Sequence, residues 1–157
     1  MKVAELMMTP PVALPRDAPV SHAARLMLDN HLSGIPVVNN DGSIAGIITD
    51  SDLVTKHAHV HVPIYLGILG GVIPIETRRQ DEEIRRALAV TAQDIMDEKY
   101  STISPEADID DAATLMVEHD ADPIAVVDHG RLVGTISRAD IIRLLVVEEA
   151  DDDSTAG

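Results

Sequence analysis

Sulfhydryl and aromatic side chains are almost missing from this 157-residue chain, which contains no cysteine, phenylalanine or tryptophan and two tyrosines. The lack of cysteine excludes disulfides and thiolate metal sites. Because hydrophobic residues still make up 45% of the chain, we expect an aliphatic core, in one compact domain or in two small halves that share it. A planar ligand would find little aromatic surface on which to stack.

Positive charge is also scarce, since 12 lysines and arginines stand against 27 aspartates and glutamates, for a formal net charge of -15. An acidic surface repels phosphate backbones, which argues against nucleic acid as a partner. The most apolar segment, residues 62–75, is too short to span a membrane and contains two prolines and three glycines. The N-terminus has no signal-peptide pattern. We therefore expect a cytoplasmic protein with no membrane partner.

A seven-residue pattern occurs twice: residues 46–52 read GIITDSD, and residues 134–140 read GTISRAD. The match extends well beyond the pattern. An offset of 89 residues aligns RLM at 25–27 with TLM at 114–116, and the offset becomes 88 after one residue is lost in a turn. A match of this length, in order and nearly without gaps, indicates an internal duplication.

Both copies predict the same order of elements, β-α-β-β-α. Apolar residues recur at helical spacing over residues 20–28 and again over residues 109–117. Strands are expected at residues 12–15, 35–39, 44–49, 101–104, 124–128 and 132–137, and a second helix near Asp50 and near Arg138. We predict an α+β fold, in which tandem β-α-β-β-α motifs pack sheet to sheet with pseudo-twofold symmetry and leave ligand clefts between them.

The chain divides into four expected parts. Residues 1–55 form the first motif and residues 94–149 the second. Residues 56–93 connect them and contain a helical pattern that continues to residue 95. This connector either completes the core or acts as a ligand lid or oligomer contact. Residues 150–157 are predicted to be an acidic disordered tail.

Each copy of the pattern places a hydroxyl residue at a predicted helix start and an acid one turn later. The hydroxyls and backbone N–H groups of Thr49 and Ser137 suit a phosphate. The carboxylates of Asp52 and Asp140 can accept two hydrogen bonds from a ribose 2′,3′-diol. The glycine that opens each copy allows close approach to a ligand or a tight turn. A purely structural role, with N-caps followed by first-turn acids, is compatible with the same residues.

On these residues the chain resembles a CBS-domain pair, the tandem regulatory module named after cystathionine β-synthase and also called a Bateman module. The resemblance covers about residues 6–53 and 94–145. It implies a regulatory, non-enzymatic protein without a cofactor that binds an adenosine-containing ligand such as AMP, ADP, ATP, S-adenosylmethionine or NAD. It also implies action through an unknown protein partner or through a homodimer made by helix contacts, for which the apolar residues 141–147 are suited.

The resemblance also implies which residues contact the nucleotide. In the family, adenine contacts come from the strand before the first helix and from the bend after that helix. Together with the hydroxyl–acid pattern, this gives the candidate residues Val12, Leu32, Ser33, Ile35, Pro36, Thr49, Asp52, Tyr100, Thr102, Ala121, Asp122, Ile124, Ser137, Arg138 and Asp140.

Several positions depart from the family's pattern. Nucleotide-binding members often carry histidine or arginine at the bend, and this chain has neither there. Asp50 would repel a phosphate, whereas Arg138 would attract one and is opposed by Asp122. We therefore do not expect tight polyphosphate binding, keep AMP and S-adenosylmethionine as competitors of ATP, and favour the second-copy cleft for phosphate.

Two alternatives to a ligand sensor stay open, namely an enzyme that depends on a metal or nucleotide and a scaffold. His57, His59 and His61 alternate, so on a strand they would face one way as a possible transition-metal site, whereas a helix would scatter them. An enzyme that depends on a metal or nucleotide would use these histidines with Asp52 and Asp140, although no nucleophile–base–orienter set is present. The other alternative is a scaffold whose clefts do not bind.

Overall fold

The computed structural model describes residues 1–54 and 90–155, which we call the first and second repeats. The first repeat contains α1 (Val3–Leu6), β1 (Leu14–Pro15), α2 (Val20–Asp29), β2 (Gly34–Val38) and β3 (Ile44–Thr49), followed by helical residues 50–54. The second contains α5 (Ala92–Ile95), β4 (Thr102–Ile103), α6 (Ile109–Glu118), β5 (Ile124–Asp128), β6 (Arg131–Ile136) and α7 (Arg138–Thr155). The β-α-β-β-α order predicted for each repeat is confirmed.

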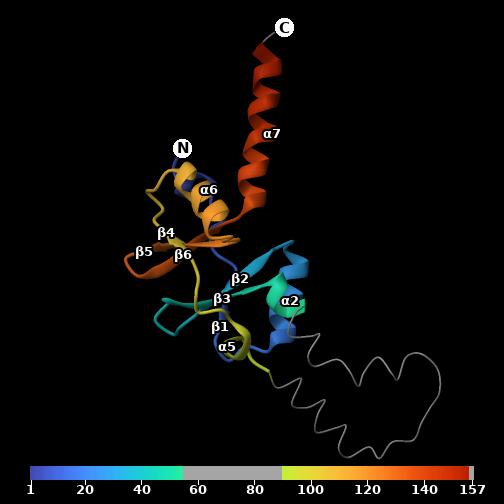
Figure 1. Ribbon diagram of the computed structural model, residues 1–157, viewed down its shortest axis with the longest axis vertical. Helices are drawn as coiled ribbons and strands as arrows, with labels where there is room; N and C mark the ends of the chain where they lie inside the picture. The colour runs from blue at the N-terminus through green and yellow to red at the C-terminus, as the bar shows by residue number, and fades with distance from the viewer. Residues whose placement is uncertain (55–89, 156–157) are drawn as a thin grey trace, which may run out of the picture.

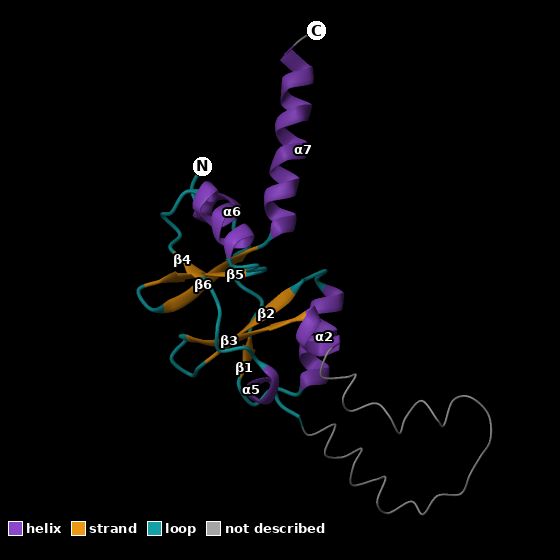
Figure 2. Ribbon diagram, viewed as in Figure 1, coloured by secondary structure: helices purple, strands orange, loops and turns teal. Residues whose placement is uncertain are grey.

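The two repeats build matching three-stranded sheets, in the orders β1-β2-β3 and β4-β5-β6. In each sheet the first strand is parallel to the second, and the second is antiparallel to the third. Both hairpins carry an irregularity at the same place, between Val37 and Val38 and between Val126 and Val127. The strands of the two repeats lie at the centre of the molecule, with α2 and α6 outside them (Figure 2).

The core is aliphatic, as the composition requires. Helix α2 buries Ala23 and Met27, and α6 buries the equivalent Ala112 and Met116, because small and flexible side chains let each helix approach its sheet closely. The largest fully buried side chains on the strands are isoleucines and valines. Each such burial stabilises the fold by about 1.5–3 kcal/mol.

The repeats exchange their leading segments, which contain α1 in the first repeat and α5 in the second. The segment after α1 crosses to the second sheet, where Met8 and Thr135 donate backbone hydrogen bonds to one another at 2.8 and 3.1 Å. The segment after α5 crosses to the first sheet, where Asp97 and Ile47 do the same at 2.8 and 3.0 Å. Val3 accordingly belongs to the core cluster of the second repeat. Each repeat therefore lacks part of its core until the other supplies it.

A second pair of contacts anchors the start of each leading segment. Lys2 forms an isolated bridge with Asp108, and Thr91 forms the equivalent bridge with Pro19. Lys2 Nζ also donates to Asp108 Oδ1 at 2.9 Å, and this hydrogen bond holds the pKa of the Asp108 carboxyl below its ordinary value. Both ends of the exchange are thus fixed by contacts between the repeats.

The exchange explains the glycines of the repeated pattern. A Cβ on Gly46 would lie 2.8 Å from Met96 Cγ, Met96 Sδ and the Asp97 carbonyl oxygen. A Cβ on Gly134 would lie 2.6 Å from Met7 Sδ. The sequence suggested close approach to a ligand, whereas the structure shows close approach of the other repeat's leading segment.

Two sequence-based boundaries differ from the structure. Helix α7 continues through residue 155 and projects from the body (Figure 1), where we expected a disordered tail from residue 150. Once a helix has formed, each further residue adds a backbone hydrogen bond, so extension costs little. The helical pattern expected up to residue 95 is broken, because Val90 is not helical and Thr91 is the N-cap of α5. No described helix is long and apolar enough to cross a membrane.

We expect Gly46→Ala to lower the free energy of unfolding by about 1–3 kcal/mol, because the added methyl overpacks this contact. Urea denaturation measures the change. The matched background is Met96→Ala, which removes the Cγ and Sδ atoms and leaves the Asp97 carbonyl. Gly46→Ala should cost less in that background, and equal costs in the two backgrounds would contradict the packing explanation.

Candidate functional site

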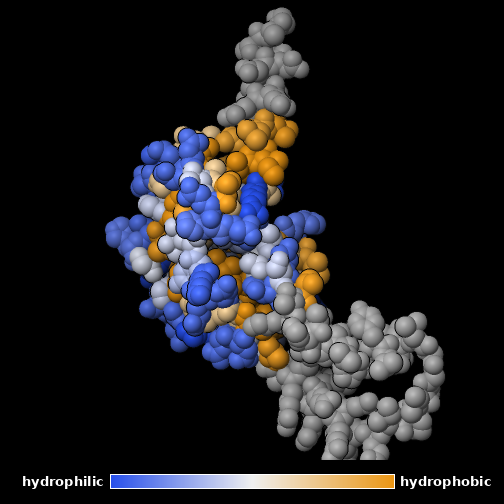
Figure 3. All heavy atoms as spheres, viewed as in Figure 1, coloured by the Kyte–Doolittle hydropathy of each residue, from blue (hydrophilic) through white to orange (hydrophobic). Residues whose placement is uncertain are grey.

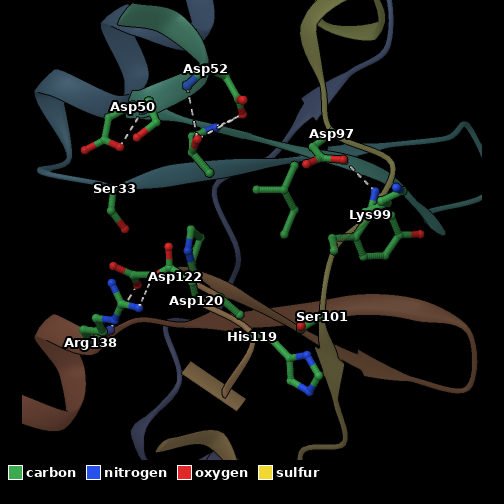
Figure 4. Close-up of a pocket in the computed structure, with 16 residues that line it drawn as sticks. Ser33, Asp50, Asp52, Asp97, Lys99, Ser101, His119, Asp120, Asp122 and Arg138 are labelled. Atoms are coloured by element: carbon green, nitrogen blue, oxygen red, sulfur yellow. Dashed lines mark hydrogen bonds and ion pairs between the residues drawn. The ribbon is translucent and has the colours of Figure 1, made fainter. Parts of the chain in front are cut away.

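A cavity of about 440 Å³ lies between the two repeats. The first repeat contributes the end of β3 and the start of the helix at residue 50, and the second contributes residues 97–101 and 119–123 with the start of α7 (Figure 4). The lining residues are Ser33, Ile47, Thr49, Asp50, Ser51, Asp52, Asp97, Lys99, Tyr100, Ser101, His119, Asp120, Ala121, Asp122, Pro123 and Arg138.

The cavity brings together seven of the candidate residues from the sequence, namely Ser33, Thr49, Asp52, Tyr100, Ala121, Asp122 and Arg138. The other eight do not line it. Ile35, Pro36 and Ile124 are buried within the sheets, because both faces of these strands are covered. Val12 and Leu32 pack against the first core cluster. Thr102 is exposed on β4, and Ser137 and Asp140 lie at the start of α7.

The remaining lining residues were not candidates. Asp97, Lys99 and Ser101 reach the cavity because the leading segment of the second repeat crosses to the first sheet. His119 and Asp120 follow the C-terminal end of α6. Asp120 has a φ of 51° and the equivalent His31 has a φ of 54°, so each turns the chain in the left-handed conformation after its helix. No local pattern in the sequence reveals the crossing itself.

Thr49 and Asp52 close the first turn of the helix that starts at residue 50. The Thr49 N–H and hydroxyl both donate to Asp52 Oδ2 at 2.9 Å. Among the described residues, nothing donates a hydrogen bond to Asp52 Oδ1. The structural role of the pattern is therefore present, and one carboxylate oxygen of a cavity-lining residue is left for a ligand.

Asp140 makes the same turn in the second repeat but uses both oxygens. Its Oδ2 accepts from the Ser137 N–H at 2.8 Å and the Ser137 hydroxyl at 2.7 Å. Its Oδ1 forms a 2.6 Å ion pair with Arg143 Nη1, and the side chain is only 10% exposed. The position equivalent to Arg143 is Thr55, so the sequence offers Asp52 no matching guanidinium. The two acids have equal positions and different availability.

Arg138 is already paired. Its Nη2 donates to Asp120 Oδ1 at 2.6 Å and to the Met116 carbonyl at 2.9 Å. The hydrogen bond from Arg138 to Asp120 raises the pKa of the guanidinium. We expected Arg138 to attract phosphate in the cleft of the second hydroxyl–acid pair, whereas the structure places it in the same cavity as Thr49 and Asp52.

The helix starts at the cavity also have their N–H groups occupied. The Arg138 N–H donates to Asp122 Oδ1 at 3.1 Å, and the Asp50 N–H donates to the Ser33 carbonyl at 2.9 Å. The Ser51 N–H donates to Asp50 Oδ1 at 2.7 Å. A phosphate would have to displace these acceptors, so neither helix start is a prepared anion site.

The charge of the described lining is strongly negative. It contains five aspartates, at positions 50, 52, 97, 120 and 122, against one lysine and one arginine. Within the described residues, no group of three or more histidine or acidic side chains could hold a metal ion. The metal prediction for His57, His59 and His61 lies outside the described residues. The cavity is therefore an acidic cleft between the repeats.

One aromatic ring borders the cleft. The Tyr100 hydroxyl donates to the Ile44 carbonyl at 3.2 Å, which fixes the half-buried ring of the second repeat against the first. Ile47, Ala121 and Pro123 also belong to the lining. These residues form the apolar part of the lining.

The family model for the CBS domain matches residues 3–59 and again residues 92–147. The chain belongs to the CBS-domain family. The uncharacterised protein MJ1426 of Methanocaldococcus jannaschii is 32% identical over 150 residues, which cover 88% of each chain.

Solved structures of CBS proteins show the same fold. The CBS domain pair of protein MJ0100, in complex with 5′-methylthioadenosine and S-adenosyl-L-methionine, has a TM-score of 0.70 at 21% identity, covering 94% of this chain and 98% of that one. CBSX2 in complex with AMP has a TM-score of 0.69 at 18% identity, with the same coverage of 94% and 98%. These likenesses confirm the tandem α+β architecture.

We expect Asp140→Asn to lower the free energy of unfolding by about 1–3 kcal/mol, because it weakens two charge-assisted hydrogen bonds and an ion pair at a buried carboxylate. Chemical denaturation measures this. The matched change is Asp50→Asn, at an exposed acid that accepts one bond within its own turn. Its effect should stay within about 0.5 kcal/mol, and similar losses from both variants would refute a structural role for Asp140.

Proposed function

We propose that this protein is a regulatory, non-catalytic sensor that binds an adenosine-containing molecule in the cleft between its repeats. The observation that carries the proposal is Asp52, which lines the cleft and whose Oδ1 accepts no hydrogen bond from the described residues. A ribose 2′,3′-diol supplies the two O–H donors that such a carboxylate accepts.

The remaining lining supports a nucleoside. The ribose would lie against Asp52 and Thr49, and adenine would lie beside Tyr100 and Ala121. A cleft of about 440 Å³ is within the usual size range of small-molecule sites. The solved complexes of CBS pairs with AMP and with 5′-methylthioadenosine and S-adenosyl-L-methionine support this class of ligand. AMP, ADP, ATP and S-adenosylmethionine are the candidates.

Signalling would follow from the position of the cleft. Its walls come from both repeats, and α7 begins at the cleft and runs out of the body. A ligand that contacts both walls stabilises one placement of the repeats, and it shifts the equilibrium only by its differential affinity for the two placements. The output would be a change in binding to a protein partner or in oligomeric state.

Catalysis by the repeated acids has little support. Asp52 and Asp140 each bind the hydroxyl and N–H of their own helix start, so neither is poised as a general base for the hydroxyl of another residue. A scaffold with a non-binding cleft is the competing proposal, and binding experiments decide between the two.

We expect Asp52→Asn to weaken adenosine binding by at least about tenfold, because the charged acceptor for the ribose diol is lost. Isothermal titration calorimetry measures the dissociation constant. Asp140→Asn is the matched control, with the same chemical change at the equivalent position, and it should leave affinity within about twofold once the variant is shown to be folded. Binding that is unchanged in Asp52→Asn, or absent from the parent protein, would refute the assignment.

We also propose that the protein forms a homodimer through the outer faces of its helices. Leu28 on α2 and Val117 on α6 occupy equivalent positions and are 76% and 83% exposed. Ile142, Leu145 and Val146 on α7 are also exposed, and apolar atoms gather along the first part of α7 (Figure 3). An apolar face that recurs by pseudo-twofold symmetry suits a self-complementary contact with a second chain.

Ile142→Glu should convert the dimer into a monomer at micromolar concentration, because it buries a charge without a partner in the proposed contact. Sedimentation velocity measures the mass. The control is Glu118→Gln on α6, which should leave the dimer intact. A parent protein that is monomeric at high concentration would contradict the homodimer while leaving the ligand site unaffected.

A further inference from the structure

We infer that Asp120 sets the ligand specificity of the cleft, by occupying Arg138 and so favouring an adenosine with an uncharged or cationic 5′ substituent over a 5′-phosphate. This inference rests on the proposed function and narrows its ligand class. A phosphate needs at least one cation or several N–H donors that are not already bound.

Arg138 lies on the left side of the cleft in Figure 4. The same side holds Asp50, Ser33, Asp122 and Asp120. Its guanidinium is held by Asp120 Oδ1 at 2.6 Å and by the Met116 carbonyl at 2.9 Å. The second bond caps the C-terminal end of α6. Arg138 is therefore paired at the wall of the cleft, and its charge is matched by Asp120, whose side chain is 92% exposed.

The other cation does not replace it. Lys99 lies on the opposite side of the cleft together with Asp97 (Figure 4), and it precedes Tyr100, beside which we place the base. If the ribose lies at Asp52 and the base beside Tyr100, the 5′ end of the nucleoside is placed on the side of Arg138 rather than on the side of Lys99 (Figure 4). At that end the lining offers Asp50, Asp120 and Asp122, three carboxylates against one paired guanidinium.

Backbone donors at that end are also occupied. The Arg138 N–H donates to Asp122 and the Asp50 N–H to the Ser33 carbonyl. A 5′-phosphate would meet the charge of three carboxylates beside a guanidinium that is already paired through Nη2, whereas a 5′-thioether or sulfonium would meet no such repulsion. Removal of the Asp120 charge releases Arg138 and reverses this preference.

The test is Asp120→Asn, measured by calorimetric titration with adenosine, 5′-methylthioadenosine and AMP. Asparagine tolerates the φ of 51° at this position, so the backbone is kept. We expect the parent to bind 5′-methylthioadenosine more tightly than AMP. In Asp120→Asn, AMP affinity should rise about tenfold, while 5′-methylthioadenosine affinity stays within about twofold.

Two further variants isolate the cause. Glu118→Gln makes the same change in net charge on an exposed residue outside the described lining, and it should not change the preference. Asp120→Asn combined with Arg138→Gln should lose the gain in AMP affinity, because the released guanidinium is the group that binds the phosphate.

The outcomes separate this inference from the proposed function. If the parent binds adenosine and Asp120→Asn gives no selective gain for AMP, the specificity assignment is overturned and the sensor proposal stands. A gain that persists without Arg138, or a gain of the same size in Glu118→Gln, also overturns it. If the parent binds none of the three compounds, the proposed function fails and the inference fails with it.

Discussion

The exchange of leading segments between the repeats is the constraint on which the structure depends. Met8 extends the second sheet and Asp97 extends the first, each by a pair of backbone hydrogen bonds. Gly134 and Gly46 lack a side chain where these segments pass, and a Cβ added at either position would clash with the segment. Each repeat buries side chains that belong to the other, so the two repeats complete one fold together rather than standing as independent domains.

The cleft is a consequence of that exchange. Residues 97–101 reach the first sheet only because their segment crosses, and they then face the hydroxyl–acid turn at Thr49 and Asp52. The close packing of Gly34 against Pro123, at equivalent positions of the two repeats, holds the walls together. A molecule in this cleft would contact both repeats at once, which is the physical basis of the proposed sensing.

Much of the fold could be predicted from the sequence, because duplication makes each repeat evidence for the other and because helix and strand periods are strong signals. The site was harder to predict. The residues chosen on the strands, such as Ile35 and Ile124, are buried because both faces of their strands are covered. Asp97 and Lys99 were missed since a crossing segment leaves no local pattern. The differing roles of Asp52 and Asp140 depend on a residue three positions later, Arg143 in one repeat and Thr55 in the other.

Asp52 and Asp140 occupy equivalent positions in the two repeats but differ in the hydrogen bonds that their carboxylates accept. The same hydroxyl–acid turn closes both helices, but an added arginine occupies the second oxygen of Asp140, whereas the Oδ1 of Asp52 accepts no hydrogen bond from the described residues. The most direct test is a crystal structure of the protein grown with adenosine. The account predicts one nucleoside per chain, with the ribose hydroxyls on Asp52 and the base beside Tyr100. A nucleoside bound at Asp140, with the Asp52 cleft empty, would contradict it.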